Sequence, residues 1–210
     1  MGDFAHQSTG MTASTLTCID LPEHPGVALL TFSRPASHNA LSGDDMTAFA
    51  VAVDRLAAKP DLRAVVVTGA GDKAFCSGAD IAEMVQLTSE AEARAMISLM
   101  GDALLKLEQL PVPVIAAING HALGGGAEIA LACDLRVVDR SARIGFVQIR
   151  RGLIPGWGGG QRLLRHVGYA RALEILLRGR VMGAEDLLAL SLATEIAPHG
   201  EALASALRLA

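Results

Sequence analysis

The stretch at residues 112–134, VPVIAAINGHALGGGAEIALACD, decides the fold of this chain. Residues 114–118 form a short apolar run, which is typical of a strand covered on both faces. Asn119-Gly120 interrupts the run, and the three glycines at 124–126 let a backbone pass very close to a neighbour or a ligand. Residues 127–132 then begin a helix, whose free N–H groups point back at the glycines. The stretch therefore predicts a buried strand, a glycine turn and a helix.

Such a turn can hold negative charge that develops on an oxygen atom, because the positive end of the helix faces it. Glu128 lies one turn into the helix, where a carboxylate is well placed for proton transfer. An isolated glycine-rich turn more often only permits close packing of a helix on a strand. A second turn, AFCSGADI at residues 74–81, follows another apolar run at 64–68. Two such turns could each donate one backbone N–H to the same oxygen, and the pair therefore favours a functional interpretation.

Apolar periodicity, together with glycine and proline at the breaks, predicts the remaining elements. Ser42 is the expected N-cap of a helix that Pro60 ends. Other elements are expected as strands at 16–21, 27–32, 135–138 and 194–197, a short helix or loop at 84–87, and helices at 89–110, 161–167, 169–178, 184–190 and 201–209. The alternation of strands and helices predicts one α/β domain with a mostly parallel sheet.

The composition limits the classes of function. Of the 210 residues, 51% are hydrophobic and 3% are aromatic, so the core of a single domain is built from Ala, Leu, Val and Ile. The 18 Lys and Arg residues against 22 Asp and Glu residues, a net charge of −4, do not suggest a nucleic-acid binder. Arginines are concentrated late in the chain, and most are expected on solvated helix faces: Arg150, Arg151, Arg162, Arg165, Arg171, Arg178 and Arg180.

Several kinds of site and location are not supported by the sequence. The three cysteines are far apart, which predicts neither a disulfide nor a zinc site, and reduced thiols fit a cytoplasmic protein. The first residues do not resemble a signal peptide, and no apolar run approaches membrane-spanning length. The loop at 156–161 lacks the last glycine of GxGxxG, and no GxxxxGK[ST], GxSxG or HExxH motif is present. We therefore expect no metal, no nucleotide cofactor and no membrane partner.

Three motifs taken together resemble the crotonase superfamily, the enoyl-CoA hydratase/isomerase group: FCSGADI at 75–81, NGHALGGGAE at 119–128 and IPGWGGGQRL at 154–163. The resemblance runs from about Leu16 to Ala210. It implies an α/β crotonase (ClpP-like) spiral fold of ββα units, with C-terminal helices that are shortened here. The expected organisation is a disordered tail at 1–14, a core domain at 15–198 and the start of a C-terminal helical region at 199–210. The resemblance also implies that the protein forms a homotrimer or a dimer of trimers.

The resemblance further implies an acyl-CoA substrate and a thioester enolate as the reactive species, with coenzyme A as part of the substrate and no separate cofactor. The enolate oxygen would accept hydrogen bonds from the backbone N–H groups of Ala79 and Gly125, because two donors are needed to stabilise that charge. Coenzyme A would cross the two turns at Ala40, Ser77, Gly78, Ala79, Asp80, Ile81, Gly124 and Gly125. Asp80 is also the expected N-cap of a following helix.

The resemblance aligns Glu128 with the first catalytic glutamate of the hydratases and predicts that an apolar cavity raises its pKa. The second hydratase glutamate falls at Gln148, counted back from Ile154-Pro155-Gly156. A neutral amide cannot transfer protons, although it can orient a water or a carboxylate. Phe146-Val147-Gln148 and Trp157 also resemble the methylmalonyl- and ethylmalonyl-CoA decarboxylase branch. The main hypothesis is therefore a hydratase or isomerase, the alternative is a decarboxylase, and a non-catalytic acyl-CoA-binding homologue is a third possibility.

Overall fold

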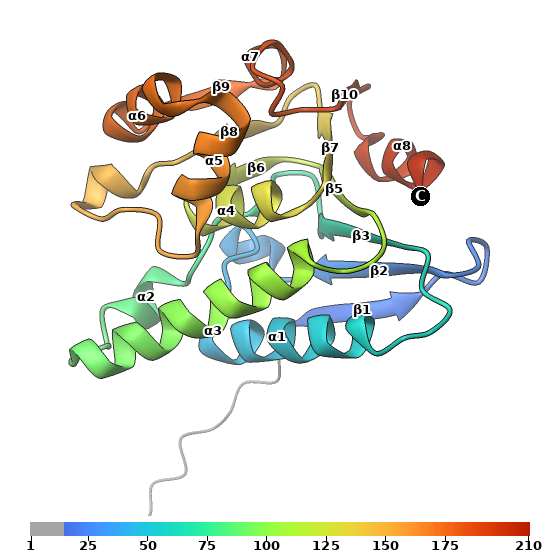
Figure 1. Ribbon diagram of the computed structural model, residues 1–210, viewed down its shortest axis with the longest axis horizontal. Helices are drawn as coiled ribbons and strands as arrows, with labels where there is room; N and C mark the ends of the chain where they lie inside the picture. Colours follow the sequence, from blue (N-terminus) through green and yellow to red (C-terminus); the bar gives the residue numbers. More distant parts are fainter. Residues whose placement is uncertain (1–14) are drawn as a thin grey trace, which may run out of the picture.

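The computed structural model describes residues 15–210, so the tail predicted at 1–14 lies outside the described residues (Figure 1). A six-stranded sheet crosses the molecule in the order β1-β2-β3-β5-β7-β10. β1 pairs antiparallel with β2 and every other pair is parallel, which confirms the predicted mostly parallel sheet. The strands are β1 Leu16–Asp20, β2 Val27–Phe32, β3 Ala64–Gly69, β5 Val114–Ile118, β7 Leu135–Asp139 and β10 Glu195–Ala197.

The apolar runs of β3 and β5 are explained by cover on both faces of this sheet. Alternate residues of a strand point to opposite faces. Val65 and Val67 of β3 join the larger core cluster, whereas Val66 joins a second cluster with Ile115 of β5. The second cluster also contains Ala202 and Ala206 of α8 (Ala202–Leu209), so α8 covers the face opposite the main core. A continuous apolar run is what such two-sided burial requires.

A second sheet of four short strands, in the order β4-β6-β8-β9, was not predicted from the sequence. Its strands are β4 Ala74–Cys76, β6 His121–Leu123, β8 Arg143–Gly145 and β9 Val181–Gly183. The sheet has three strand pairings, and each of them joins strands that lie far apart along the chain. Strands of three residues are too short to show an alternating pattern, and the sequence analysis interpreted two of them as parts of glycine turns.

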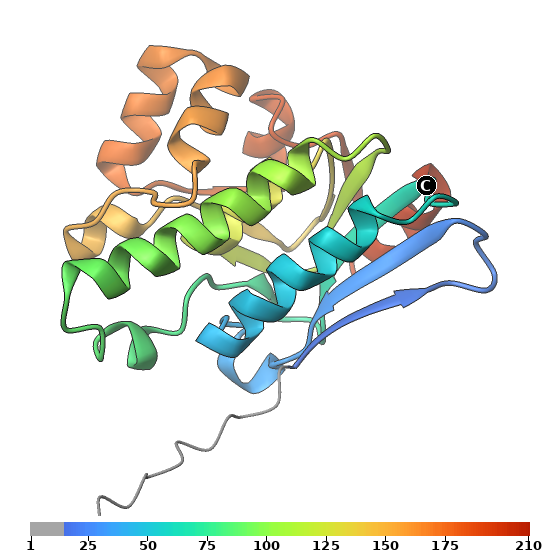
Figure 2. The ribbon, with the colours of Figure 1, turned by 60° about the horizontal axis from the view of Figure 1, so that its bottom comes forward.

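Two long helices cover the main core side of the six-stranded sheet and lie side by side in both views (Figures 1 and 2). They are α1 (Gly43–Ala57) and α3 (Glu90–Glu108). Ser42 and Ser89 begin these helices with capping boxes, in which each serine accepts from the N3 backbone and the N3 carboxylate accepts in return. The predicted N-cap role of Ser42 is confirmed.

The remaining helices of the described residues are shorter than α1 and α3. They are η1 Pro35–Ser37, α2 Ile81–Met84, α4 Gly125–Ala132, η2 Gln148–Arg151, α5 Gly159–Val167, α6 Tyr169–Arg178 and α7 Ala184–Ala189. A short helix or loop was expected at 84–87. The helix α2 lies before this segment, because the Asp80 side chain accepts from the Ala82 N–H at 3.0 Å and caps the helix there, and the residues after Met84 form a turn. Within residues 15–210, no helix combines the length and the apolarity needed to cross a bilayer.

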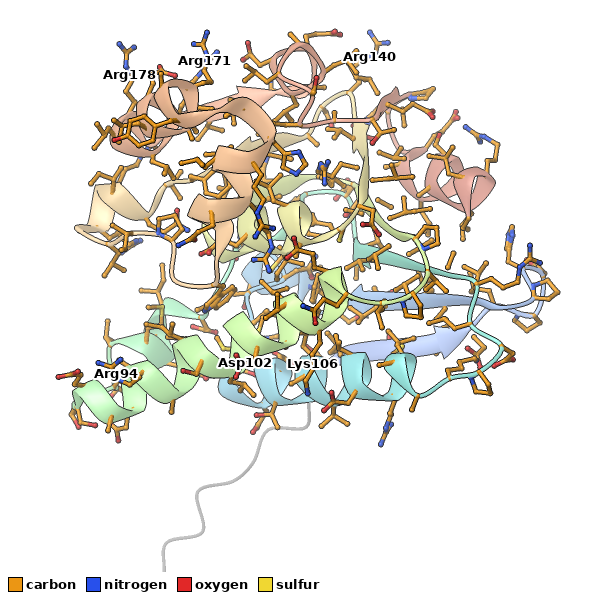
Figure 3. The ribbon with its side chains drawn as sticks, in the orientation of Figure 1. Arg94, Asp102, Lys106, Arg140, Arg171 and Arg178 are labelled. Atoms are coloured by element: carbon orange, nitrogen blue, oxygen red, sulfur yellow. The ribbon has the colours of Figure 1, made fainter. Side chains whose placement is uncertain are left out.

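Most of the late arginines lie on solvated helix faces, as predicted. Figure 3 shows Arg171 and Arg178 at the periphery of the molecule, where both pair with Glu174. Arg162 is the exception, because its side chain is only 7% exposed. It donates to Glu108 at 3.0 Å and to the Trp157 carbonyl at 2.8 Å, and it therefore ties the glycine loop before α5 to α3.

Candidate active site

The two glycine turns meet where α4 begins. Gly78 has a φ of +90°, and a Cβ atom built on it would lie 2.7 Å from the Gly125 backbone nitrogen. Gly126 is tighter still, because its Cβ would lie 1.9 Å from the carbonyl oxygen of Cys76 in β4. Both contacts are closer than any side chain permits, so the glycines allow the N-terminus of α4 to rest directly on the FCSGAD turn.

Two backbone donors face outward from this junction. Ala79 forms an isolated parallel bridge with Leu41. The hydrogen bonds of this bridge are made by its neighbours: the Leu41 N–H donates to the Gly78 carbonyl, and the Asp80 N–H donates to the Leu41 carbonyl. The N–H of Ala79 therefore points to the other side, and it has no hydrogen-bond acceptor among residues 15–210. The N–H of Gly125, in the first turn of α4, likewise has no acceptor within that range. Both residues line one cavity of about 200 Å³.

Glu128 lies in the wall of the same cavity and is almost completely buried, at 2% exposure. Its Oε2 accepts from the backbone N–H of Trp157 at 2.7 Å and from that of Gly159 at 2.8 Å. Its Oε1 accepts from Gln148 Nε2 at 3.0 Å. Gly159 must lack a side chain, because a Cβ there would lie 2.4 Å from Cγ of Glu128. The carboxylate is thus held in one orientation by the loop that precedes α5.

Burial raises the pKa of the Glu128 carboxyl above its ordinary value, as the sequence analysis predicted. The N–H groups of Gly159 and Trp157 and the amide of Gln148 act in the opposite direction, because each stabilises the charged form. The loss of solvation on burial has a larger effect on the pKa than these hydrogen bonds. A carboxyl group with a raised pKa exchanges protons more readily near neutral pH than an exposed glutamate does.

Trp157 closes the site from the loop side. A Cβ on Gly125 would lie 2.2 Å from Cζ3 of the Trp157 indole, so the ring packs directly against the backbone of the first α4 residue. The indole is 4% exposed and also lines the cavity. The sequence analysis quoted the loop but did not assign this contact, because the indole and Gly125 meet only in the folded chain.

The cavity brings together most of the residues that the sequence analysis selected. Its lining contains seven of them: Ser77, Ala79, Ile81, Gly124, Gly125, Glu128 and Gln148. Gly78 lies behind the wall against Gly125. The lining also contains eight side chains that were not selected as site residues: Met84, Met96, Ile97, Val147, Arg151, Leu153, Ile154 and Trp157. Met84 of α2 and Met96 and Ile97 of α3 come from other elements, and no local motif marks them.

Ala40 and Asp80 are not in the cavity lining. Arg34 joins them, because its guanidinium donates to the Ala40 carbonyl at 3.1 Å and to the Asp80 carboxylate at 3.0 Å. Asp80 also caps α2, which confirms the structural task predicted for it. A role for these residues in binding coenzyme A stays a prediction. Within the described range, no cluster of three His, Cys, Asp or Glu side chains could hold a metal ion.

Comparison with known proteins identifies the family to which this chain belongs. The enoyl-CoA hydratase/isomerase family model matches residues 23–210. The chain belongs to the enoyl-CoA hydratase/isomerase family. The crotonase fold and the assignment to this family of enzymes are therefore confirmed, whereas the finer resemblance to the decarboxylase branch is not shown.

Relatives in this family support the assignment over most of the chain. The chain is 39% identical over 187 residues to a putative enoyl-CoA hydratase/isomerase, YngF, of Bacillus subtilis, a match that covers 86% of this chain and 72% of that protein. It is 36% identical to the short-chain-enoyl-CoA hydratase of Clostridium acetobutylicum, over 93% of this chain and 74% of that protein. The crystal structure of an enoyl-CoA hydratase from Bacillus anthracis matches with a TM-score of 0.87 and 35% identity, over 93% of this chain and 74% of that chain.

Proposed function

We propose that this enoyl-CoA hydratase/isomerase family member binds an acyl-CoA thioester and stabilises its enolate between the N–H groups of Ala79 and Gly125. The observation that carries the proposal is the placement of both unpaired donors in the same small cavity as a buried glutamate. Charge on a thioester oxygen costs too much free energy in an apolar cavity unless preorganised donors meet it. The two N–H groups supply such donors without any side-chain movement.

Glu128 is the proposed acid and base for hydration of a 2-enoyl thioester. As a carboxylate it accepts a proton from the attacking water while the water oxygen bonds to C3 of the substrate. The electrons of the double bond move to the thioester oxygen, where Ala79 and Gly125 stabilise the enolate. Glu128 then returns the proton to C2, so the product gains one hydroxyl group and one hydrogen. A single carboxyl group balances both proton transfers.

Gln148 is the proposed positioning residue for Glu128. Its Nε2 donates to the carboxylate, whereas its Oε1 is buried with no hydrogen-bond partner among the described residues. Rotation of the amide by half a turn would bring this acceptor to the O–H of the protonated acid. An amide at this position can therefore satisfy Glu128 in both protonation states, which suits a group that first gains and then returns a proton.

The test is mass spectrometry of the products after the protein is incubated with crotonyl-CoA in isotopically labelled water. We expect the label to enter the product, and we expect Glu128→Gln to lower the rate by about 10²- to 10⁴-fold. The variant should stay folded, because an amide oxygen can still accept from Trp157 and Gly159. Retention of the rate within a few-fold in Glu128→Gln would remove Glu128 from the mechanism.

Decarboxylation of a methylmalonyl- or ethylmalonyl-type thioester is the second candidate function. It is motivated by one observation, the amide of Gln148 beside Glu128, at the position where the two-glutamate mechanism implied by the resemblance would place its second carboxylate. Loss of carbon dioxide also forms an enolate, but it needs no base to activate water. Carbon dioxide release from ethylmalonyl-CoA without hydration of crotonyl-CoA would select this alternative. Binding of both thioesters without any product would select the non-catalytic homologue.

The assembly proposed for this chain follows from the family resemblance alone, and the location follows from the well-separated cysteines. A homotrimer or a dimer of trimers stays a prediction, which sedimentation equilibrium of the purified protein would check. A cytoplasmic location likewise stays a prediction.

A further inference from the structure

One cation lines the cavity that contains Glu128. It is Arg151, the last residue of η2, and no other Lys, Arg or His belongs to the cavity wall that residues 15–210 form. The Arg151 guanidinium has no hydrogen-bond or ion-pair partner in the described part of the chain. Arg151 and Glu128, the two charged side chains of the cavity, therefore do not neutralise each other.

The geometry of η2 directs Arg151 to the same side as Gln148. η2 is a 3₁₀ helix, in which residues three positions apart lie on one face. Gln148 is the first residue of η2 and Arg151 is the fourth, and both line the cavity. Because Gln148 Nε2 donates to the Glu128 carboxylate, Arg151 lies one turn further along the same wall.

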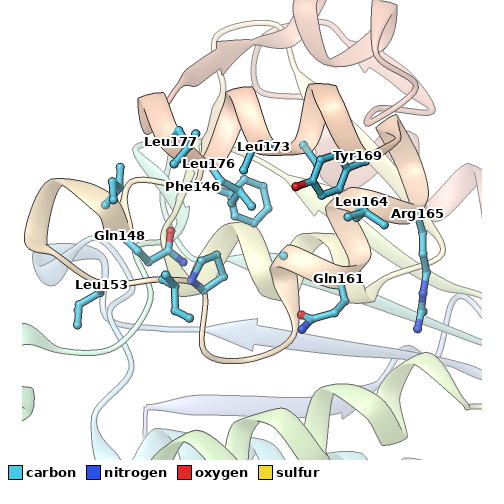
Figure 4. A pocket seen from close by; sticks show the side chains of 15 residues that line it. Phe146, Gln148, Leu153, Gln161, Leu164, Arg165, Tyr169, Leu173, Leu176 and Leu177 are labelled. Carbon is cyan, nitrogen blue, oxygen red and sulfur yellow. The ribbon is translucent and has the colours of Figure 1, made fainter.

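Neighbouring cations already have partners. Arg150, the preceding residue of η2, donates to the Gly179 carbonyl at 2.9 Å and does not line the cavity. An apolar groove of about 620 Å³ adjoins the cavity between η2 and α6, and Figure 4 shows Arg165 at one side of it. Arg165 pairs with Glu108 at 2.8 Å. The unpaired cation is therefore specific to the cavity of the candidate active site.

An arginine without a partner in such a wall is suited to one class of ligand group. Its planar guanidinium matches the two oxygens of a carboxylate and donates to both. Met84, Ile97 and Leu153 in the same wall are apolar, and an ion pair is stronger where side chains exclude water. The cavity therefore offers a carboxylate both an opposite charge and partial shielding from solvent.

We infer that Arg151 binds a carboxylate at the end of the acyl group, so that the substrate class is the monothioester of a short dicarboxylic acid. This inference rests on the proposed function, because it places the thioester oxygen between Ala79 and Gly125. Acyl carbons that leave this position pass Glu128 and then meet the wall formed by η2. The carboxylate is held during hydration and is not altered by it.

The size of the cavity limits the length of this acid. A closed apolar cavity of about 150 Å³ takes a group the size of benzene. The cavity at Glu128 has a volume of about 200 Å³, so it accommodates an acyl group of about five carbons that ends in a carboxylate. A glutaryl group is of this size.

Calorimetric titration with glutaryl-CoA and pentanoyl-CoA tests the inference without catalytic turnover. Both thioesters are saturated and have five acyl carbons, and they differ in a terminal carboxylate against a terminal methyl group. We expect the wild-type protein to bind glutaryl-CoA about tenfold more tightly, the lower end of the range for hydrogen bonds to a charged group. In Arg151→Met this preference should disappear. Arg151 is exposed and has no partner in the described chain, so the substitution is compatible with folding.

Arg150→Met is the matched control, because it removes the same charge from the adjacent residue of η2, which does not line the cavity. It should keep the tenfold preference. Equal affinities of the wild type for the two thioesters would overturn the inference, as would an equal loss of preference in both variants. If Arg151→Met weakens glutaryl-CoA, pentanoyl-CoA and free coenzyme A by the same factor, Arg151 binds the phosphates of coenzyme A and the inference is wrong.

These outcomes are separate from those of the proposed function. A preference for glutaryl-CoA that depends on Arg151, without hydration of crotonyl-CoA or glutaconyl-CoA, would retain the carboxylate site and reject hydration. Hydration of crotonyl-CoA by a protein that binds glutaryl-CoA and pentanoyl-CoA equally would do the reverse.

Discussion

Replacement of Gly126 by alanine should destabilise the protein strongly, because Gly126 makes the closest contact between the two glycine turns. The new Cβ would lie 1.9 Å from the Cys76 carbonyl oxygen, whereas ordinary contacts begin near 3.4 Å. The N-terminus of α4 would have to move by more than an ångström away from β4, which belongs to a strand pair and cannot move freely. Overpacking of this kind costs about 3 kcal/mol, at the upper end of the usual range.

Gly101→Ala is the matched control and should have the opposite effect. Gly101 lies inside α3, and a Cβ there would meet no atom within 4 Å. Because alanine has a higher helix propensity than glycine, the free energy of unfolding should rise by about 1 kcal/mol. In a chain of this size the melting temperature should rise by roughly 2–4 °C in Gly101→Ala and fall by about three times as much in Gly126→Ala.

Urea denaturation followed by circular dichroism measures both effects. The midpoints should move in opposite directions while the slope with denaturant stays constant. Gly126→Ala should also lose most of its activity where it is still folded, because the adjacent Gly125 N–H would be displaced. A Gly126→Ala protein within about 1 kcal/mol of the wild type would refute the close approach of α4 to β4.

Three further predictions follow from burial and charge. Burial raises the pKa of Glu128 in the folded protein. The free energy of unfolding of the wild type, relative to that of Glu128→Gln, should therefore be greatest below about pH 4.3, the usual pKa of an unfolded glutamate, and should fall as the pH rises through the higher folded-state pKa. Urea midpoints that change in parallel for both proteins from pH 4 to 8 would contradict this prediction. Arg162→Met should cost about 2–3 kcal/mol in the same assay, because it leaves the buried Trp157 carbonyl without its side-chain donor and removes one of the two arginines that donate to Glu108; a change below 0.5 kcal/mol, typical of a surface site, would show that these contacts are not stabilising. Burial raises the pKa of Cys76 and of Cys133 to about 12. A thiol reagent at neutral pH should therefore modify only the exposed Cys18 until urea is added. Rapid reaction of more than one thiol in the native protein would show that the core opens.

Local features of the chain were sufficient to predict the elements whose causes are themselves local. β5 has the bounds expected from its apolar run, and α6 has the bounds expected from its periodicity. The caps at Ser42 and Asp80 are side-chain contacts with residues two or three positions away. Interactions of such short range depend little on the rest of the chain, so a motif or a pattern reports them directly.

The second sheet and the environment of Glu128 could not be predicted in the same way. β4 and β6 are three residues long, and they pair only because the six-stranded sheet brings residues 74 and 121 together. The donors to Glu128 Oε2 are backbone N–H groups of Trp157 and Gly159. Every residue except proline carries such a donor, so the side-chain sequence contains no mark of which ones will face a carboxylate.

By itself the sequence determined the class of fold, the family, and the two turns and the glutamate on which the proposed chemistry depends. These follow from glycines, apolar runs and a carboxylate at fixed positions along the chain. Only the tertiary structure decided that Arg162 is buried, that Gln148 contacts Glu128, and that an apolar groove adjoins the site. These features join elements far apart in the chain, and their burial exists only after the helices and both sheets have packed.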